Sequence, residues 1–198
     1  MNSLTDVRDM LEAYQPWNDQ EKQDQYVILK YLRIFDDLLV RDNELLHLTA
    51  SSWILNPSHD KVLMIYHNLY DSWGWTGGHA DGDADLLHVA IKEAEEETGI
   101  KDLIVLSKEI LGLDILPVWH HVKRGHFVSS HQHANVTYLF EADEKLPLTM
   151  KPDENKGVMW IPITQLHEYV SEPDMLPVYE KLNKKAKFMI TDMTEKRG

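Results

Sequence analysis

The stretch GHADGDADLLHVAIKEAEEETGI, residues 78–100, decides the fold of this chain. Apolar residues recur in it at the spacing of one helix face: Leu86, Leu87, Ala90, Ile91 and Ala94. Asp85 precedes this apolar stripe as an N-cap residue, and Gly99 follows it as a C-terminal stop. The stretch therefore predicts a glycine loop, one amphipathic helix with a buried stripe, and a second glycine turn.

Three glutamates of the predicted helix, Glu93, Glu96 and Glu97, are three and four residues apart and share a face beside the apolar stripe. Like charges at this spacing repel, and partly buried carboxylates take up protons unless a positive group compensates them. Mg²⁺ suits such a site because it uses a few carboxylates, several waters and the phosphates of a substrate. The alternative is an acidic run on a solvated helix face.

The frame around these glutamates resembles the Nudix box of the Nudix, or MutT-like, hydrolases. The positions that match the box pattern at the family's spacing are Gly78, Glu93, Ala94, Glu96, Glu97, Gly99 and Ile100. The resemblance implies an α/β fold, the Nudix-type α/β/α sandwich with a mixed sheet. It also implies hydrolysis, with Mg²⁺ or Mn²⁺, of a diphosphate linkage in a nucleoside diphosphate joined to another group. By this resemblance Glu93, Glu96 and Glu97 are catalytic and, with Gly78, metal-binding; the cation activates a water and a glutamate accepts its proton.

Two positions depart from the box pattern. Lys92 stands in place of the arginine, and lysine keeps the charge but loses the planar fork that binds two carboxylate oxygens at once. Ala84 stands in place of the first glutamate, a position that supports the loop and helix in the family; Asp81, Asp83 or Asp85 is expected to take over part of that role. These departures leave open a catalytically weak Nudix-fold module for ligand sensing or interaction. The same-fold alternative, an isopentenyl diphosphate isomerase-like enzyme, normally uses a cysteine, and this chain has none.

The composition narrows the classes of partner. The chain has 198 residues with 43% hydrophobic content, and its formal charge of −13 argues against a nucleic-acid polymer or an anionic membrane as partner. The same charge repels a polyphosphate, which again favours a metal as the positive element of the site. No run is long and apolar enough to span a bilayer, and the first residues do not form a secretory signal. We expect a cytoplasmic protein with a small-molecule diphosphate as substrate, and a homodimer stays open.

Outside the box, the sequence predicts a helical extension followed by the Nudix-like domain. Residues 1–44 are assigned to the extension, with helices at Val7–Tyr14 and Asp19–Val40, and residues 45–198 to the domain. The expected strands of the domain are Leu46–Leu55, Lys61–His67, Leu103–Leu116, Val136–Glu141 and Val158–Ile163. A last helix is expected from Pro177 on.

Several residues outside the glutamate trio are candidates for contact with the substrate. His79 follows the box glycine, and His131 and His133 lie two apart on a predicted strand, so both point to one side. Such a pair can bind zinc or hold phosphate, or can pack as ordinary polar strand residues. By resemblance, the strand runs beside the substrate, which favours substrate contact over a second metal site. Trp75 is a candidate for stacking on a flat group of the substrate, with the core as its alternative. Glu154 lies six residues before Trp160, where many Nudix proteins carry a glutamate that acts as a base or an additional metal ligand; its alternative is a surface acid in a polar loop.

Overall fold

The computed structural model describes residues 3–123, 125–152 and 155–196. Within these residues a seven-stranded sheet forms the centre, with the order β3-β2-β1-β8-β5; β4 also pairs with β1, and β9 with β2. The strands are β1 (Leu46–Leu55), β2 (Lys61–His67), β3 (Ser72–Gly74), β4 (Thr76–His79), β5 (Ile104–Val118), β8 (His131–Glu141) and β9 (Asn155–Pro162). Strands β1 and β8 are parallel and the other pairs are antiparallel, so the sheet is mixed as predicted.

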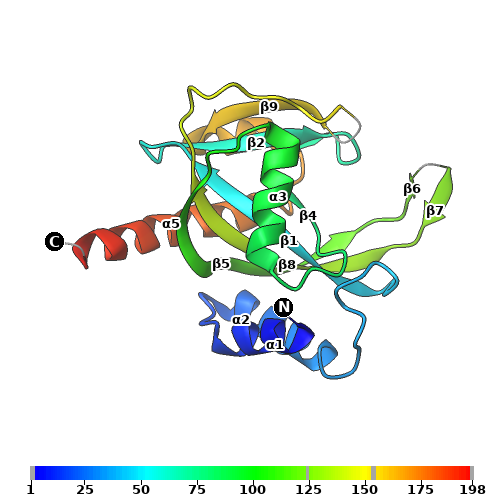
Figure 1. Ribbon diagram of the computed structural model, residues 1–198. Helices are drawn as coiled ribbons and strands as arrows, with labels where there is room; N and C mark the ends of the chain where they lie inside the picture. The colour runs from blue at the N-terminus through cyan, green and yellow to red at the C-terminus, as the bar shows by residue number, and fades with distance from the viewer. Residues whose placement is uncertain (1–2, 124, 153–154, 197–198) are drawn as a thin grey trace.

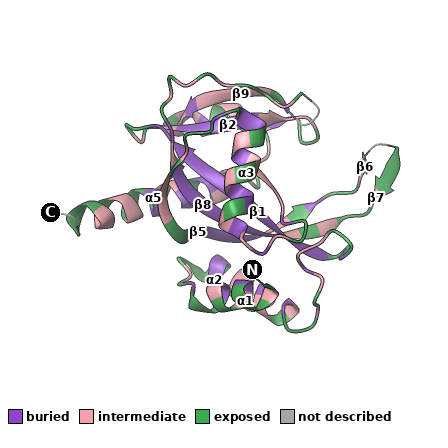
Figure 2. Cartoon of the chain, viewed as in Figure 1, coloured by how far each residue is buried: buried purple, intermediate pink, exposed green. Residues whose placement is uncertain are grey.

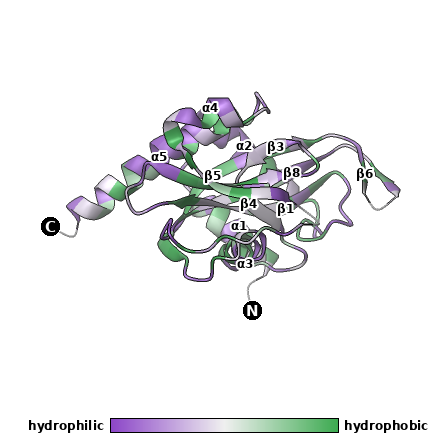
Figure 3. Ribbon diagram, turned by 90° about the horizontal axis from the view of Figure 1, so that it is seen from above, coloured by the Kyte–Doolittle hydropathy of each residue, from purple (hydrophilic) through white to green (hydrophobic). Residues whose placement is uncertain are grey.

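Helices cover both faces of this sheet. Helices α1 (Leu4–Ala13) and α3 (Leu86–Thr98) lie on one side, and α4 (Leu166–Tyr169) and α5 (Leu176–Glu195) on the other, as Figure 3 shows in the view from above. A short 3₁₀ turn at Ile163–Gln165 leads into α4. Between β5 and β8 the chain forms a separate hairpin of β6 (His121–Lys123) and β7 (His126–Val128), which projects from the sheet (Figure 1). The predicted α/β/α sandwich is confirmed.

Two apolar clusters hold these layers together. One packs α1, α2 (Asp19–Tyr31) and α3 against the sheet around Leu48, Ala90 and Val136. The other packs α4 and α5 around Trp53, Leu139 and Leu182 on the opposite face. Figure 2 shows that the buried residues concentrate in the central strands. By contrast, Val122 of β6 and Phe127 of β7 are exposed. Among the described residues, no helix is long and apolar enough to cross a membrane.

The second helix of the extension is shorter than its sequence predicts. Helix α2 covers Asp19–Tyr31, so the expected continuation to Val40 is wrong. The Leu38 carbonyl instead accepts a hydrogen bond from the Leu48 N–H of β1 (2.7 Å), and the Leu39 carbonyl accepts one from the Gly82 N–H of the box loop (2.8 Å). Leu38 is fully buried. The backbone groups of the segment after α2 therefore form hydrogen bonds with the domain, and its apolar side chains pack there, so the segment does not continue the helix.

A buried ionic network ties the extension to the domain. The Glu21 carboxylate on α2 is fully buried and accepts hydrogen bonds from the Tyr14 hydroxyl (2.6 Å) and the Lys185 ammonium (3.1 Å). Lys181, one turn earlier on α5, lies 3.2 Å from Glu21 and 2.6 Å from Asp114 on β5. Buried charges of this kind need every partner, because each ion has lost its hydration.

The assignment of residues 1–44 to a helical extension and of residues 45–198 to the Nudix-like domain stays a prediction.

Candidate active site

The loop that precedes α3 is held by aspartates. Asp85 caps the helix, because its side chain accepts a hydrogen bond from the His88 N–H (3.1 Å). Asp83 accepts from the Asp85 N–H (2.9 Å) and lies 2.7 Å from the His88 ring, and Asp81 binds the Arg41 guanidinium through both carboxylate oxygens. Ala84 is buried in the core beside them. Three neighbouring aspartates thus order the loop at the place where the box pattern has a glutamate.

Two of the three box glutamates turn toward the glycines of β4. Glu97 is 3% exposed, and its carboxylate accepts a hydrogen bond from the Gly77 N–H at 3.0 Å. Glu93 lies against Gly78 so closely that a Cβ on this glycine would come within 2.4 Å of the Glu93 carboxyl carbon. A side chain at Gly77 would likewise meet Ser51 and the Ala50 carbonyl. The glycines are therefore needed because the helix carboxylates and the strand backbone approach each other closely.

The third box glutamate, Glu96, points outward. Its side chain is 43% exposed and accepts a hydrogen bond from the Lys151 ammonium at 3.1 Å. The Lys92 ammonium, which replaces the arginine of the box pattern, lies 3.8 Å from Glu96 and 3.7 Å from Glu93. Lys92 thus supplies positive charge to two of the carboxylates, although without a guanidinium's paired hydrogen bonds. The predicted common face is confirmed at Glu93 and Glu97, whereas Glu96 lies at its solvent edge.

This donor set fits a hard divalent cation such as Mg²⁺ or Mn²⁺. Three carboxylates stand on neighbouring turns of one rigid helix, and the two that are less exposed face a glycine strand whose backbone leaves them room. Carboxylate oxygens are the ligands that such cations prefer, and the partial exposure of Glu96 leaves access for water and phosphate. We therefore take Glu93, Glu96 and Glu97, with Gly78 beside them, as the candidate metal-binding set.

A row of polar side chains lies on the sheet face opposite α3. The Asn135 side-chain oxygen on β8 accepts hydrogen bonds from Thr49 (2.9 Å) and Ser51 (2.8 Å) of β1, and the Asn135 amide donates to Thr137 (3.1 Å). Ser52, the next residue along β1, points the other way, to the Ala90 carbonyl of α3. A buried row of hydrogen-bonded polar groups is unusual for a sheet interior, and here it leads toward a group of histidines.

Four histidines gather at the end of this polar row. The rings of His131 and His133 point to the same side as predicted, with 3.3 Å between their Nε2 atoms. His79 of β4 lies 4.8 Å from His133 between ring centres, and His47 of β1 lies 5.0 Å from both. Burial and the neighbouring histidine His79 lower the pKa of His133 to about 2, and burial also lowers the pKa of His47. Both rings are therefore neutral near pH 7.

His47 is absent from the candidates that the sequence offers. It joins the cluster because β1 and β8 run parallel in a register that sets His47 opposite His133. The alternation of side chains along β1 explains why His47 faces the same side as His79, because His47 is two residues from Thr49, which pairs with His79. The pairing itself joins segments far apart along the chain, and no local pattern encodes it.

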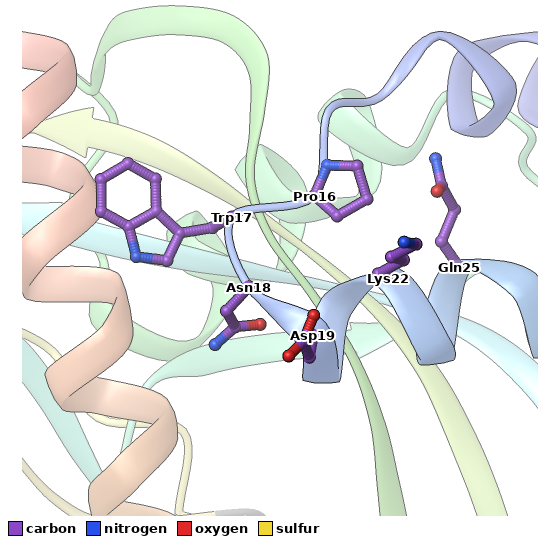
Figure 4. A pocket seen from close by; sticks show the side chains of 6 residues that line it. All are labelled: Pro16, Trp17, Asn18, Asp19, Lys22 and Gln25. Atoms are coloured by element: carbon purple, nitrogen blue, oxygen red, sulfur yellow. The ribbon is translucent and has the colours of Figure 1, made fainter.

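The other predicted substrate residues lie elsewhere or outside the described part. Trp75 is half-buried and packs edge-on against Tyr179 of α5 at 5.2 Å, within the second apolar cluster. Glu154 lies outside the described residues. A separate open pocket of about 350 Å³, shown in Figure 4, sits at the turn between α1 and α2 and is lined by Pro16, Trp17, Asn18, Asp19, Lys22 and Gln25. It contains none of the box residues.

Comparisons with known proteins agree with this geometry. The family model described as the NUDIX domain matches residues 45–182. A search of curated protein sequences found no match. Similar solved structures include a Nudix hydrolase from M. smegmatis, RenU, with a TM-score of 0.54 and 16% identity over 72% of this chain and 86% of that one. A C. elegans Ap4A hydrolase has a TM-score of 0.50 and 14% identity over 73% of this chain and 98% of that one. The E. coli dihydroneopterin triphosphate pyrophosphohydrolase has a TM-score of 0.51 and 12% identity over 68% of this chain and 92% of that one. At these identities the structures show a shared fold.

Proposed function

Because the chain belongs to the Nudix family of hydrolases, we propose that it hydrolyses a diphosphate linkage in a nucleoside diphosphate joined to another group, with Mg²⁺ or Mn²⁺ as cofactor. The observation that carries this proposal is the meeting of Glu93 and Glu97 with the β4 glycines. A run of acids on a solvated helix face would not be buried against a strand in this way. The departures at Ala84 and Lys92 do not favour the sensing module, since aspartates order the loop and Lys92 lies near two carboxylates.

The roles of the trio follow from their surroundings. When bound, a divalent cation polarises phosphate oxygens and lowers the pKa of a bound water. Glu93 and Glu97 are held in place by the close glycines and by the Gly77 N–H, so they present oxygens without reorganisation. Glu96 is open to solvent, and a glutamate that is not fully engaged with the cation accepts the proton of the attacking water. Lys92 and Lys151 offset the negative charge that a phosphate would meet.

We further propose that the substrate lies beside β4 and β8. His79, His131 and His133 stand at the end of the polar row of Thr49, Ser51, Asn135 and Thr137, which offers donors and acceptors for the group joined to the diphosphate. Trp75 is kept as a stacking candidate, and Glu154 as a further acid. The proposed partner is a small molecule, not a nucleic-acid polymer or a membrane. We propose a cytoplasmic location, with a homodimer as one possible assembly.

A hydrolysis screen tests this proposal. The compounds are ADP-ribose, a dinucleoside polyphosphate, an oxidised nucleoside triphosphate and a sugar nucleotide. Each is incubated with Mg²⁺ or Mn²⁺, and products are counted by phosphate release with and without a coupled phosphatase. We expect turnover of at least one compound. If none is hydrolysed while one binds tightly, the sensing module is the better description.

The variants Glu96→Gln and Glu95→Gln make the screen specific. Both remove one carboxylate charge from α3, but Glu95 lies outside the trio. We expect kcat to fall by about two orders of magnitude or more in Glu96→Gln, because base or ligand function is lost, while the melting temperature stays near that of the wild type. Glu95→Gln is expected to keep its activity. Equal activity of the two variants would contradict the assigned role of Glu96.

A further inference from the structure

We propose that His47, His79 and His133 bind one divalent transition-metal ion of the zinc class, at a site separate from the box carboxylates. One ligand nitrogen from each of the three rings lies within 4.8 Å of the others. Zn–N bonds of about 2.0–2.1 Å in a tetrahedral site place such nitrogens about 3.4 Å apart, so the three nitrogens have to approach one another by at most about 1.4 Å to share one ion. The inference does not depend on the proposed hydrolysis, because the ion would bind whether or not the protein turns over a substrate.

Strand register brings these three rings to one face. His47 on β1 pairs with His133 on β8, and Thr49 on β1 pairs with His79 on β4. Paired residues share a face of the sheet, and residues two apart on a strand do as well, so all three side chains leave the backbone on the same side. The three strands are part of the central sheet, and the ligand positions are therefore set by rigid elements rather than by mobile loops.

The His47 ring is prepared to bind a metal ion through its Nε2 atom. His47 is 4% exposed, and its Nδ1 lies 2.9 Å from the Asn43 carbonyl oxygen, which only accepts hydrogen bonds. Nδ1 therefore carries the proton, and Nε2 presents a lone pair. That Nε2 atom is buried and has no hydrogen-bond partner among the described residues. An unpaired buried nitrogen costs free energy, whereas a metal ion would satisfy it, and a carbonyl on the other ring nitrogen is the usual support of a metal-binding histidine.

The histidine next to the set has the same arrangement. The Nδ1 atom of His131 lies 2.8 Å from the Ser129 carbonyl oxygen, which leaves its Nε2 lone pair directed at the Nε2 atom of His133, 3.3 Å away. The ring of His131 also lies 4.9 Å from that of His47. Imidazole nitrogens gathered in this way, in a chain of net charge −13, favour a cation among them. Neutral imidazoles select zinc, nickel or copper over magnesium, and no cysteine is needed for three nitrogen ligands and an open position.

The histidine site and the carboxylate site lie on opposite faces of β4. Gly78 faces Glu93 of α3, and the next residue, His79, points to the other face, because successive strand residues alternate. The ligand types differ as well, with imidazole nitrogens on one side and carboxylate oxygens on the other. A zinc-class ion with three protein ligands keeps a coordination position for an oxygen of water or of a substrate. The predicted contact of these histidines with the substrate would then be made through the ion.

Zinc retention by the untagged full chain tests this inference. The protein is dialysed against Zn²⁺ in a large excess of Mg²⁺, which occupies the carboxylates, and bound zinc is then counted by atomic spectroscopy. We expect one Zn²⁺ per chain and a higher melting temperature than with Mg²⁺ alone, because the ion binds the folded state. Failure to retain zinc in stoichiometric amount would overturn the inference, whatever the hydrolytic activity of the protein.

Variants locate the ion. His47→Asn keeps a donor for the Asn43 carbonyl at the place of Nδ1 but lacks the Nε2 ligand, and it should weaken zinc binding at least about 100-fold, since losing a mere supporting partner costs 10- to 100-fold. His133→Asn should do the same. The control His167→Ala removes an exposed histidine of α4, and Glu97→Gln alters the carboxylate site; both should retain one Zn²⁺. Equal zinc binding in His47→Asn and the wild type would overturn the inference.

Spectra of the wild type test the zinc site without any substitution, so they stay informative if a variant does not fold. Co²⁺ replaces zinc at such sites and reports its ligands by visible absorption, and the side-chain ¹⁵N resonances of histidine report which ring nitrogen is bound. We expect three Nε2 or Nδ1 resonances to shift together on addition of one equivalent of Zn²⁺, with no change at the exposed histidines. A cobalt spectrum of six oxygen ligands, or zinc-induced shifts spread over exposed histidines, would show adventitious binding and overturn the inference.

Discussion

Adding one methyl group at Gly78 should displace the Glu93 carboxylate and lower activity without unfolding the protein. The new Cβ would lie 2.4 Å from the Glu93 carboxyl carbon, whereas ordinary contact begins at 3.4 Å, so the carboxylate must retreat by about 1 Å. A misplacement of about 1 Å in a catalytic group costs about 100-fold in rate. We therefore expect Gly78→Ala to lower kcat/KM about 100-fold, or about 2.7 kcal/mol of transition-state stabilisation. The overpacking itself should cost about 1–3 kcal/mol of folding free energy.

The assay combines kinetics with urea denaturation. Activity is measured on the best compound of the hydrolysis screen. The control is Gly74→Ala on β3, whose Cβ would meet the Tyr179 hydroxyl at 3.2 Å and no box residue among those described. The double variant Gly78→Ala/Glu93→Gln should be no slower than Glu93→Gln alone, because both changes act on the same carboxylate. Wild-type activity in Gly78→Ala would refute the reasoning that activity depends on the close contact between Gly78 and Glu93. Fully additive losses in the double variant would refute it as well.

The remaining predictions concern the metal, the buried charges and acid. Mg²⁺ or Mn²⁺ at about 100 times its Kd should stabilise the wild type by about 2.7 kcal/mol in thermal unfolding and stabilise Glu97→Gln less; an unmoved wild-type melting curve contradicts the site. Glu21→Gln should lower the free energy of unfolding by about 3–5 kcal/mol, because it leaves buried lysines unpaired, whereas Glu12→Gln, at an exposed ion pair, should cost less than about 1 kcal/mol in the same urea titration. Burial alone would raise the pKa of Glu21, but the Tyr14 hydrogen bond and the two lysines outweigh it and lower the pKa below its ordinary 4.5. The unfolded chain therefore binds a proton below about pH 4.5 that the folded chain does not, so stability should fall there with decreasing pH, and less steeply in Glu21→Gln; equal slopes would show that Glu21 is not the group responsible.

Much of the fold could be predicted because its determinants are local. The apolar stripe, the Asp85 cap and the Gly99 turn all act within a few residues, and α3 begins and ends where they predict. The strands Leu46–Leu55 and Lys61–His67 also have the predicted bounds. The resemblance to the Nudix box singles out the three glutamates, and a helix of fixed period carries their spacing into space.

Tertiary contacts determined the end of α2 and the surroundings of the box glutamates, which local patterns do not predict. Helix α2 stops at Tyr31 because the following residues bond to β1 and the box loop, although their own pattern suits a helix. The different surroundings of Glu96 and Glu97 depend on where β4 crosses α3.

The histidine site shows this division most clearly. The sequence supplied His79, His131 and His133 by motif and strand parity, yet the ligand with the buried, unpaired nitrogen, His47, came only from the structure. Its place is set by the parallel pairing of β1 with β8, in which Thr49 and Asn135, 86 positions apart, come into hydrogen-bond contact. Register between distant strands is fixed by the packing of the whole sheet, because a shift of one residue would turn every side chain to the other face. The sequence alone therefore determined β1, β2 and α3 with its three glutamates, and the assembled sheet determined which side chains meet.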